Sequence, residues 1–338
     1  MKTKTILLSI FLFSNFLIFQ SCTFNDRETG LPRSSGKTSE LLVIAKKARW
    51  DSYIGDSISN FFGQTQLGLP QDEPIFDVVC LDPKVLADKM FKQHHNIFIV
   101  DINPKLKKVS IDNKKNFWAS PQRIIKIAAP SDTAFLRVFE KNKENLLYLF
   151  LKNERIRTQN TLSAFEDASI RRKLKKKYHL SMKVPGGSYI AKQEKNFVWI
   201  RKEPQKYSLG ILIYYSKYTD TLAFKLENII AKRDSVTKKY IPGSVKNSYM
   251  TTAKLVKPTS KVVNFNNLYA VEVRGLWEVE NDFMGGPFLS YTLVDEINNR
   301  IVTAEGFVYA PNVDKRDYLL QLEAILYTLK FEKETENK

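Results

Sequence analysis

The first third of the folded chain alternates between short apolar runs and segments with helical spacing. The apolar runs cover residues 41–45, 75–81 and 96–101 and are typical of buried strands. Between them, residues 52–62 carry apolar side chains at helical intervals and stop at Gly63, and a second helix is predicted over 84–92. This alternation of strand and helix predicts an α/β unit around a central sheet.

A long helical region comes next. Residues 131–178 keep an apolar stripe at helical spacing, and a break is predicted near Asn153 or Asn160. Pro185, Gly186 and Gly187 then end the region. We expect this Pro-Gly-Gly sequence to mark a boundary between two halves of the chain.

The second half is rich in predicted strands. Paired strands are predicted over 197–201 and 209–215, a helix over 221–237, an alternating strand over 269–274, a hairpin of 288–293 and 300–309 around Asn298 and Asn299, and an amphipathic helix over 315–329. The simplest architecture is an antiparallel sheet backed by helices. The predicted fold class is therefore α+β (mixed α/β), an N-terminal α/β unit followed by a largely antiparallel sheet.

The N-terminus has the pattern of an export signal. Lys2 and Lys4 precede an apolar run over 6–19, and Ser21 stands just before Cys22. The pattern resembles a bacterial lipoprotein signal, in which the cysteine is diacylated and becomes the new N-terminus. A transmembrane anchor and a plain secretory signal are the alternatives, but the run is shorter than the roughly 20 apolar residues of a spanning helix. We expect lipidation at Cys22, with palmitate among the acyl chains, and the lipid bilayer as a partner.

These patterns divide the chain into five segments. They are a lipoprotein signal peptide over 1–21, a flexible polar tether over 22–40, an N-terminal α/β half over 41–183, a C-terminal strand-rich α+β half over 184–332 and a polar tail over 333–338. The hydrophobic fraction of 43% and the 22 phenylalanines are ample for a packed core.

Charge narrows the expected partners. The formal net charge is +17, and a basic exported protein meets anionic lipids, glycans or envelope proteins rather than nucleic acid. The alternative is that lysine simply dominates a solvated surface. We expect a location in the cell envelope, lipid-anchored in the outer membrane and facing the periplasm, with exposure at the cell surface as the other orientation.

Cysteine usage argues against a disulfide framework. The chain has two cysteines, Cys22 and Cys80, and acylation of the first leaves the second without an intrachain partner. Cys80 lies in an apolar run, so a small core residue is a better interpretation of it than a nucleophile.

Several sequence blocks together resemble one family. They are Gly63-Gln64, Gly68-Leu69-Pro70-Gln71, residues 96–101, Lys238-Lys239-Tyr240-Ile241-Pro242-Gly243, residues 248–252 and, most specifically, residues 274–288. These blocks resemble the DUF4837 family of exported lipoproteins from Bacteroidetes-type bacteria, over about residues 37–332. The family has no established activity, so the resemblance implies a compartment and an architecture but no active site.

The block over 274–288 is the best candidate for a site. Arg274, Trp277 and Phe283 offer charge and stacking surface for a ligand, and Gly285, Gly286 and Pro287 follow them. The alternative is a tight turn between strands with Trp277 packed in the core. The carboxylates Glu278, Glu280 and Asp282 suggest a hydrolase, although acid–base work needs two carboxylates across a cleft.

Two further patterns have both a functional and a structural interpretation. The basic run Arg171, Arg172, Lys173, Lys175, Lys176 and Lys177 suits either a helix C-terminus or contact with an anionic surface. Ser57, Thr133, Thr221 and Ser235 each follow an aspartate and precede a small or aliphatic residue. Exported proteins of these bacteria can be O-glycosylated at such tripeptides, whereas helix capping explains the same residues structurally.

Metal and cofactor motifs are missing from the sequence. His94, His95 and His179 have no metal-ligand spacing, and neither a nucleophile elbow nor a phosphate loop occurs. We therefore expect no metal and no cofactor. The leading hypothesis is a non-catalytic, membrane-anchored envelope lipoprotein that binds a ligand or partner through its strand-rich half. The alternative is a hydrolase of envelope glycan or peptide that uses carboxylates near Glu278 and Asp282.

Overall fold

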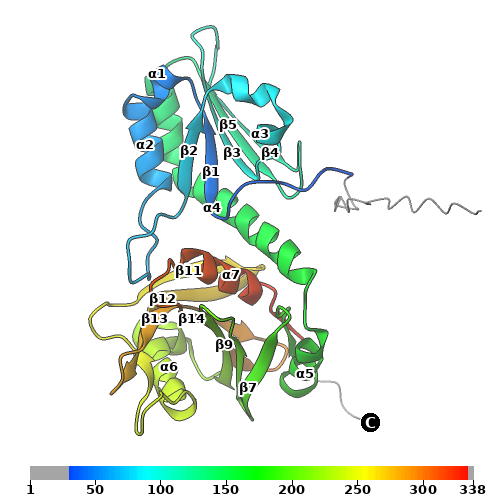
Figure 1. Cartoon of the computed structure of the whole chain (residues 1–338), viewed down its shortest axis with the longest axis vertical. Helices are drawn as coiled ribbons and strands as arrows, with labels where there is room; N and C mark the ends of the chain where they lie inside the picture. Colours follow the sequence, from blue (N-terminus) through cyan, green and yellow to red (C-terminus); the bar gives the residue numbers. More distant parts are fainter. Residues whose placement is uncertain (1–29, 334–338) are drawn as a thin grey trace, which may run out of the picture.

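The computed structural model describes residues 30–333 and has the predicted α+β fold. Two sheets lie one above the other along the long axis of the molecule, and the helix α4 (Asp132–Ser163) runs from the first sheet toward the second (Figure 1). No helix in the described residues is both long enough and apolar enough to cross a bilayer.

The first sheet has five strands in the order β2-β1-β3-β5-β4. These strands are β1 (Glu40–Ile44), β2 (Asp77–Leu81), β3 (Asn96–Ile102), β4 (Ser110–Lys115) and β5 (Arg123–Ala129). Strands β1, β2, β3 and β5 are parallel, and β4 pairs antiparallel with β5 at one edge. The α/β unit predicted for the first half is therefore present.

Helices cover both faces of this sheet. They are α1 (Lys47–Trp50), α2 (Tyr53–Phe62), the 3-10 helix η1 (Pro83–Ala87), α3 (Lys89–Lys92) and α4. Phenylalanines of α2 and α4 fill one face, where Phe62 and Phe150 pack edge-to-face at 5.8 Å. Ser52 caps α2, and the helix ends at Gly63, as the sequence predicted.

The predicted break inside the long helix is wrong. Helix α4 is continuous through Asn153, and the chain breaks only between Ser163 and α5 (Ala168–Tyr178). Asn153 is buried, and its amide donates to the carbonyl oxygen of His95 at 2.9 Å. Because its side chain bonds to another segment, Asn153 does not compete with its own helix backbone.

The second sheet is antiparallel and has eight strands. The order is β10-β12-β13-β14-β9-β8-β7, and β11 also pairs with β12. Its strands are β7 (Ser188–Glu194), β8 (Phe197–Lys202), β9 (Ser208–Lys217), β10 (Tyr249–Thr252), β11 (Thr259–Phe265), β12 (Leu268–Glu280), β13 (Gly285–Asp295) and β14 (Arg300–Tyr309). The paired strands near residue 200 and the hairpin of β13 and β14 are confirmed.

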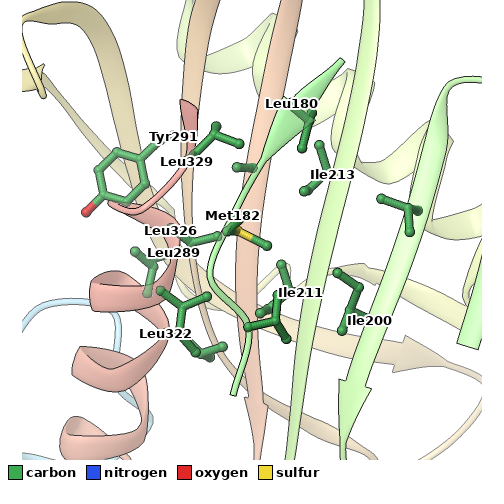
Figure 2. Packing of buried hydrophobic residues seen from close by; sticks show 14 of the residues in the cluster. Leu180, Met182, Ile200, Ile211, Ile213, Leu289, Tyr291, Leu322, Leu326 and Leu329 are labelled. Atoms are coloured by element: carbon green, nitrogen blue, oxygen red, sulfur yellow. The ribbon is translucent and has the colours of Figure 1, made fainter. Parts of the chain in front are cut away.

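Two layers enclose the second sheet. Helix α7 (Arg316–Leu326) and α5 cover one face, where Leu322 and Leu326 pack on Ile211 and Leu289 (Figure 2). The 3-10 helix η2 (Thr221–Phe224) and α6 (Leu226–Tyr240) cover the other. A small two-stranded sheet of β6 (Leu180–Ser181) and β15 (Lys330–Phe331) brings Glu332 beside α5.

A side chain of the N-terminal half caps the first turn of helix α7 in the C-terminal half. The carboxylate of Glu73, in the loop before β2, accepts hydrogen bonds from the backbone N–H groups of Lys315 and Arg316 at 2.8–3.0 Å. Arg316 also donates to Asp77 at 2.9 Å. These contacts fix the first turn of α7 against the N-terminal half, since the free N–H groups of a helix start bind a carboxylate well.

Candidate functional site

A cleft of about 560 Å³ lies where the two halves meet. The N-terminal half contributes α4 and the loop around Gln66, and the C-terminal half contributes β11, β12 and α7. Apolar side chains on its walls include Leu67, Ile75, Leu147, Leu151, Val262, Leu319 and Leu320. A cleft of this size between two halves is the usual form of a binding site.

One wall of the cleft is an edge of β11, which within residues 30–333 pairs with β12 alone and is free on its other side. The hairpin from β11 to β12 turns through Asn266 and Asn267, both with positive φ, so that Phe265 pairs with Leu268. In such a hairpin the closing pair exchanges two hydrogen bonds, and every second residue after it does the same. The backbone N–H and C=O groups of Ser260, Val262 and Asn264 therefore point away from β12, into the cleft.

A buried charge network forms the floor. Arg274 of β12 donates to Glu272 at 2.8 Å and to Glu323 of α7 at 2.6 Å. Arg155 of α4 approaches Glu323 at 3.4 Å, and its guanidinium lies 3.6 Å from the centre of the Tyr327 ring. The network thus connects one strand and two helices that come from both halves.

Neighbouring charges keep the side chains of Glu272 and Arg274 ionised. Burial alone would raise the pKa of Glu272, but the charges of Arg274 and Lys261 and the hydrogen bond from Tyr291 outweigh it and lower the pKa to about 2. Burial would likewise lower the pKa of Arg274, whereas Glu272 and Glu323 raise it well above the usual value. Neither group exchanges a proton near neutral pH.

The arrangement suits recognition better than acid–base chemistry. General acids and bases need pKa values near the working pH, and the pKa values of Glu272 and Arg274 are held far from it. The charged residues that line the cleft are four basic and two acidic, namely Arg155, Lys261, Arg274, Arg316, Glu272 and Glu323. Arg316 is paired with Asp77 outside this set, and the positive charge that remains beside apolar walls favours an anionic, partly apolar ligand.

The structure separates the three residues proposed as a ligand-binding group. Arg274 lies in the cleft floor. Trp277 is buried on the opposite face of the sheet, and its indole N–H donates to the carbonyl of Val308 at 3.2 Å. Phe283 is fully exposed at the tip of the turn between β12 and β13. Trp277 and Phe283 therefore form no common stacking surface, and Gly285 and Gly286 are the first residues of β13 rather than a turn.

The carboxylates of the same block lie outside the cleft. Glu278 is on β12, and Glu280 pairs with Lys254 at 3.1 Å. Asp282 accepts hydrogen bonds from the hydroxyl of Ser244 and from the backbone N–H of Phe283. These bonds lower the pKa of Asp282, the Ser244 hydroxyl most strongly, and they explain its place as a turn-capping residue.

The basic run lies on one exposed helix. All six cations are on α5 and face solvent, while Leu174 and Tyr178 on the same helix are buried. Arg171 pairs with Glu166 at 2.7 Å and Lys175 with Glu332 at 3.3 Å. The last three lysines stand in the final turn of α5, where they interact favourably with the helix dipole.

The four candidate glycosylation residues all lie in helices. Thr133, Thr221 and Ser235 are exposed, whereas Ser57 is half-buried and donates to the carbonyl of Tyr53 at 2.8 Å. Of the preceding aspartates, Asp220 caps a helix by accepting from Leu222 N–H at 2.7 Å. Asp56, Asp132 and Asp234 have other positions, so capping explains one tripeptide only.

Cys22 lies outside the described residues, and Cys80 is partly buried in β2. Burial raises the pKa of the Cys80 thiol, which disfavours the reactive thiolate. Within residues 30–333 no group of three His, Cys, Asp or Glu side chains is placed to hold a metal ion.

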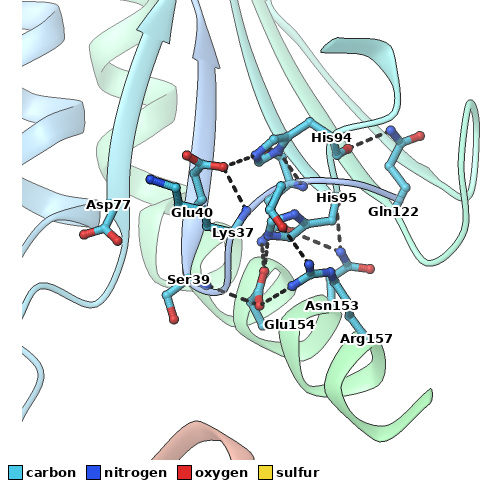
Figure 3. A network of polar contacts seen from close by, with 12 residues as sticks. Lys37, Ser39, Glu40, Asp77, His94, His95, Gln122, Asn153, Glu154 and Arg157 are labelled. Atoms are coloured by element: carbon cyan, nitrogen blue, oxygen red, sulfur yellow. Dashed lines mark hydrogen bonds and ion pairs between the residues drawn. The ribbon is translucent and has the colours of Figure 1, made fainter. Parts of the chain in front are cut away.

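The histidine pair is part of a buried polar network that fixes the start of the described chain (Figure 3). The rings of His94 and His95 stack at 4.5 Å. His94 Nε2 lies 3.0 Å from Glu40, and His95 contacts the fully buried Glu154. Glu154 also accepts from Asn96 at 2.9 Å. The network ties β1, β3 and α4 together beside residues 34–39.

Sequence reasoning found Arg274 but missed its partners. Glu272, Arg155 and Glu323 come from three separate elements, and each resembles an ordinary surface charge in the sequence. One usable signal was present. Glu272 and Arg274 both alternate with the apolar side chains of β12, so a strand covered on both faces had to bury them.

Two families of unknown function match the chain. Residues 34–163 match the domain of unknown function DUF8532, and residues 167–328 match the domain of unknown function DUF4837. The second match confirms the family suggested by the sequence blocks. It covers the C-terminal half only, so the blocks near Gly68 and Asn96 belong to the DUF8532 match.

Similarity to solved structures is low. The Ran-binding protein Mog1p of Saccharomyces cerevisiae has a TM-score of 0.31 and 8% identity over 46% of this chain and 91% of that chain. A point mutant of protein Mog1 gives 0.28 and 8% over 46% and 92%. TM-scores at this level support no conclusion about fold or function. No curated protein matches the sequence.

Proposed function

We propose that this chain, whose C-terminal half belongs to the DUF4837 family, is a non-catalytic envelope protein that binds an extended, acidic segment of a partner protein. The segment adds as a strand to the free edge of β11 and places its side chains in the cleft between the halves. The observation that carries the proposal is the unpaired edge of β11 opening into that cleft. Strand addition to a sheet edge is a common mode of peptide recognition.

Exposure of β11 supports this mode. Val262 is 64% exposed, and Thr259, Ser260, Lys261 and Asn264 are exposed as well. Native sheets usually shorten, cover or charge such edges, because an open edge recruits other strands. An open edge with an exposed valine beside a cleft therefore fits a docking site.

Charge determines which strand is accepted. Lys261 lies on the edge strand and reaches Glu272 at 3.3 Å with most of its side chain in solvent. An antiparallel pair of two β11 strands centred on Lys261 would place the two lysines against each other, and like charges across a strand pair are unfavourable. An acidic segment instead complements the excess of basic side chains in the cleft.

The test is binding of a short peptide to the full chain. An eight-residue peptide in which glutamate alternates with valine should bind, whereas one in which lysine replaces glutamate should not. Val262→Pro removes an outward N–H, as an edge strand tolerates, and should weaken binding about tenfold or more. Val262→Ala keeps that N–H and is the matched control, with binding within about twofold.

Charge reversal tests the second half of the proposal. Lys261→Glu should weaken binding of the glutamate peptide, while Lys257→Glu outside the cleft lining should leave it unchanged. Equal binding of both peptides, or full binding by Val262→Pro, would contradict the proposal. If the protein without peptide forms a dimer and Val262→Pro dissociates that dimer, the edge of β11 binds a second copy of the chain, and this result too would contradict the proposal.

The place of action is part of the same proposal. The lipoprotein-like leader supports acylation at Cys22 and anchoring in the outer membrane, on its periplasmic side. The exposed cations of α5 support contact with anionic head groups. Cys22→Ala should abolish palmitate labelling and move the protein to the soluble fraction. Membrane retention of this variant, together with an unlabelled wild type, would refute the anchor.

A further inference from the structure

A second pocket, of about 340 Å³, lies under the start of α6 in the C-terminal half. Its floor is the face of the sheet formed by β9, β13 and β14, and its mouth is formed by η2, the first turn of α6 and the loop at Thr219. It is separate from the cleft between the halves, because the two sets of lining residues do not overlap.

An unpartnered hydroxyl is buried in this floor. The Tyr214 side chain lines the pocket and is only 3% exposed. Its hydroxyl lies near Thr303, but no hydrogen bond of ordinary geometry joins it to any described residue. Burial raises the pKa of Tyr214, so the group keeps its proton and can donate. A buried polar atom without a partner is costly unless something else in the pocket binds it.

Two more hydroxyls stand in the same floor. Thr292 and Thr303 are buried and lie 3.0 Å apart, oxygen to oxygen. One hydroxyl donates to the other, and each oxygen keeps a free lone pair for a second partner. The floor therefore presents three hydroxyl groups, and the apolar side chains of Ile229 and Ile301 line the same pocket.

A rigid ion pair stands behind the floor. Arg233 and Glu305 are both fully buried, and the guanidinium donates to the carboxylate twice, at 2.8 and 3.0 Å. Arg233 also donates to Thr252 at 3.0 Å. Because Arg233 and Glu305 bond to each other, the pair holds α6 on the sheet, and the Tyr214 hydroxyl is the floor group that has no partner among the described residues.

The mouth adds polar groups and no net charge. The charged side chains that line the pocket are Asp220 and Lys232, one of each sign. Asn228 lines the mouth beside them. A carboxylate, an amide and an ammonium around a set of hydroxyls can each bond to neighbouring hydroxyls of a sugar ring.

We propose that this pocket binds a neutral sugar residue of monosaccharide size. The buried hydroxyls of Tyr214, Thr292 and Thr303 bond to hydroxyls on one edge of the ring. The apolar side chains contact the C–H face of the sugar, and the mouth groups bond to its outer edge. The balance of charge disfavours an anionic ligand, and the volume lies at the small end of ligand pockets.

Calorimetric titration of the full chain with D-glucose, D-galactose, D-mannose and N-acetylglucosamine is the direct test. At least one should bind with a dissociation constant on the order of a millimolar, as expected for so small a ligand. Cyclohexanol matches the ring size but has one hydroxyl, and it should bind at least about tenfold more weakly. Failure of all four sugars to bind, or equal binding of cyclohexanol, would overturn the proposal.

Variants locate the site. Tyr214→Phe removes a hydroxyl that has no hydrogen-bond partner among the described residues, so the fold should keep its melting temperature while sugar affinity falls about five- to tenfold. Lys232→Met should also weaken binding, whereas Lys239→Met, farther along α6, should not. Unchanged affinity in Tyr214→Phe would overturn the proposal. If Tyr214→Phe has a lower melting temperature and the wild type binds no sugar, the pocket holds water in place of a ligand. That result would also overturn the proposal.

Hydrogen exchange of the wild-type protein locates the sugar-binding site without any substitution. The bound sugar should slow amide exchange in residues 219–232, which form the mouth of the pocket. Protection confined to other parts of the chain would overturn the assignment. Because the pocket and the cleft share no lining residue, failure here leaves peptide binding at β11 standing.

Discussion

In the N-terminal half, aliphatic and phenylalanine side chains cover both faces of the parallel sheet, and buried polar groups gather at one end beside residues 34–39. In the C-terminal half, each face of the antiparallel sheet carries a buried ion pair. Arg274 of β12 donates to Glu323 of α7 on one face, and Arg233 of α6 donates to Glu305 of β14 on the other. Apolar packing holds the covering helices in both halves, and the C-terminal half adds an ion pair that reaches α7 and another that reaches α6.

Apolar packing and ion pairing differ in what they specify. Apolar burial is strong but non-directional, and many side-chain arrangements of similar volume satisfy it. A buried ion pair adds little net stability but is costly to break, so it disfavours other helix positions. Our hypothesis is that the pairs hold α6 and α7 in register so that the pocket and the cleft keep their shapes.

The largest expected effect comes from breaking the pair under α6. Arg233→Met leaves Glu305 buried without a partner and should lower the free energy of unfolding by about 3–5 kcal/mol. The double variant Arg233→Met, Glu305→Leu should recover most of that loss, because apolar side chains can replace a buried pair. Chemical denaturation measures both. A double variant no more stable than the single would refute the pairing explanation.

A smaller effect is expected at the polar end of the N-terminal half. Glu154→Gln puts an amide N–H₂ among groups that donate to the carboxylate, namely Asn96 and the backbone of Ser39. The substitution should lower the free energy of unfolding by about 2 kcal/mol. Hydrogen exchange should quicken first in residues 34–40. Uniform quickening over the whole half, with no early loss there, would show that the network does not act locally.

The apolar core should respond less sharply. Phe150→Leu keeps an apolar side chain at the centre of the phenylalanine cluster and should cost about 1–2 kcal/mol. Tyr148→Leu, at a more exposed position on the same helix, is the control and should change stability by less than about 0.5 kcal/mol. If Phe150→Leu lowers the free energy of unfolding more than Arg233→Met does, the ion pair under α6 is less costly to break than the phenylalanine cluster is to alter, contrary to this comparison.

The smallest expected change is in the response to acid. Burial and the charge of His95 lower the pKa of His94, although Glu40 opposes them, so the unfolded chain takes up a proton before the folded chain does. The free energy of unfolding should fall as pH drops through about 6.5, and level off once folded His94 is protonated too.

Thermal unfolding between pH 8 and pH 5 measures this slope. His94→Gln should flatten it, while His95 and Glu154, which face the same network, remain. His179→Asn is the matched control, because asparagine tolerates the left-handed backbone that His179 adopts, and its slope should equal the wild type's. If the melting temperature depends on pH equally in the wild type and both variants, His94 does not cause the acid sensitivity.

Strongly patterned elements were predictable and weakly patterned ones were not. The buried strands β1 and β3, the hairpin of β13 and β14, and α7 follow their apolar periods closely. Strands β4 and β11 escaped notice because they lie at sheet edges, where most side chains face solvent and no apolar period exists. The edge that we propose as the docking site was therefore invisible in the sequence.

The sequence by itself determined the order of the strongly patterned helices and strands, the α/β unit followed by an antiparallel sheet, and the expectation that Arg274 lies near a site, because short-range periodicity and turn residues encode them. Only the tertiary structure decided which charges meet. Arg155, Glu272 and Glu323 come together through the packing of α4 and α7 on β12, and Tyr214 loses its water because α6 covers the sheet. Contacts between distant segments depend on how whole elements pack, and the local pattern of a single chain does not record that packing.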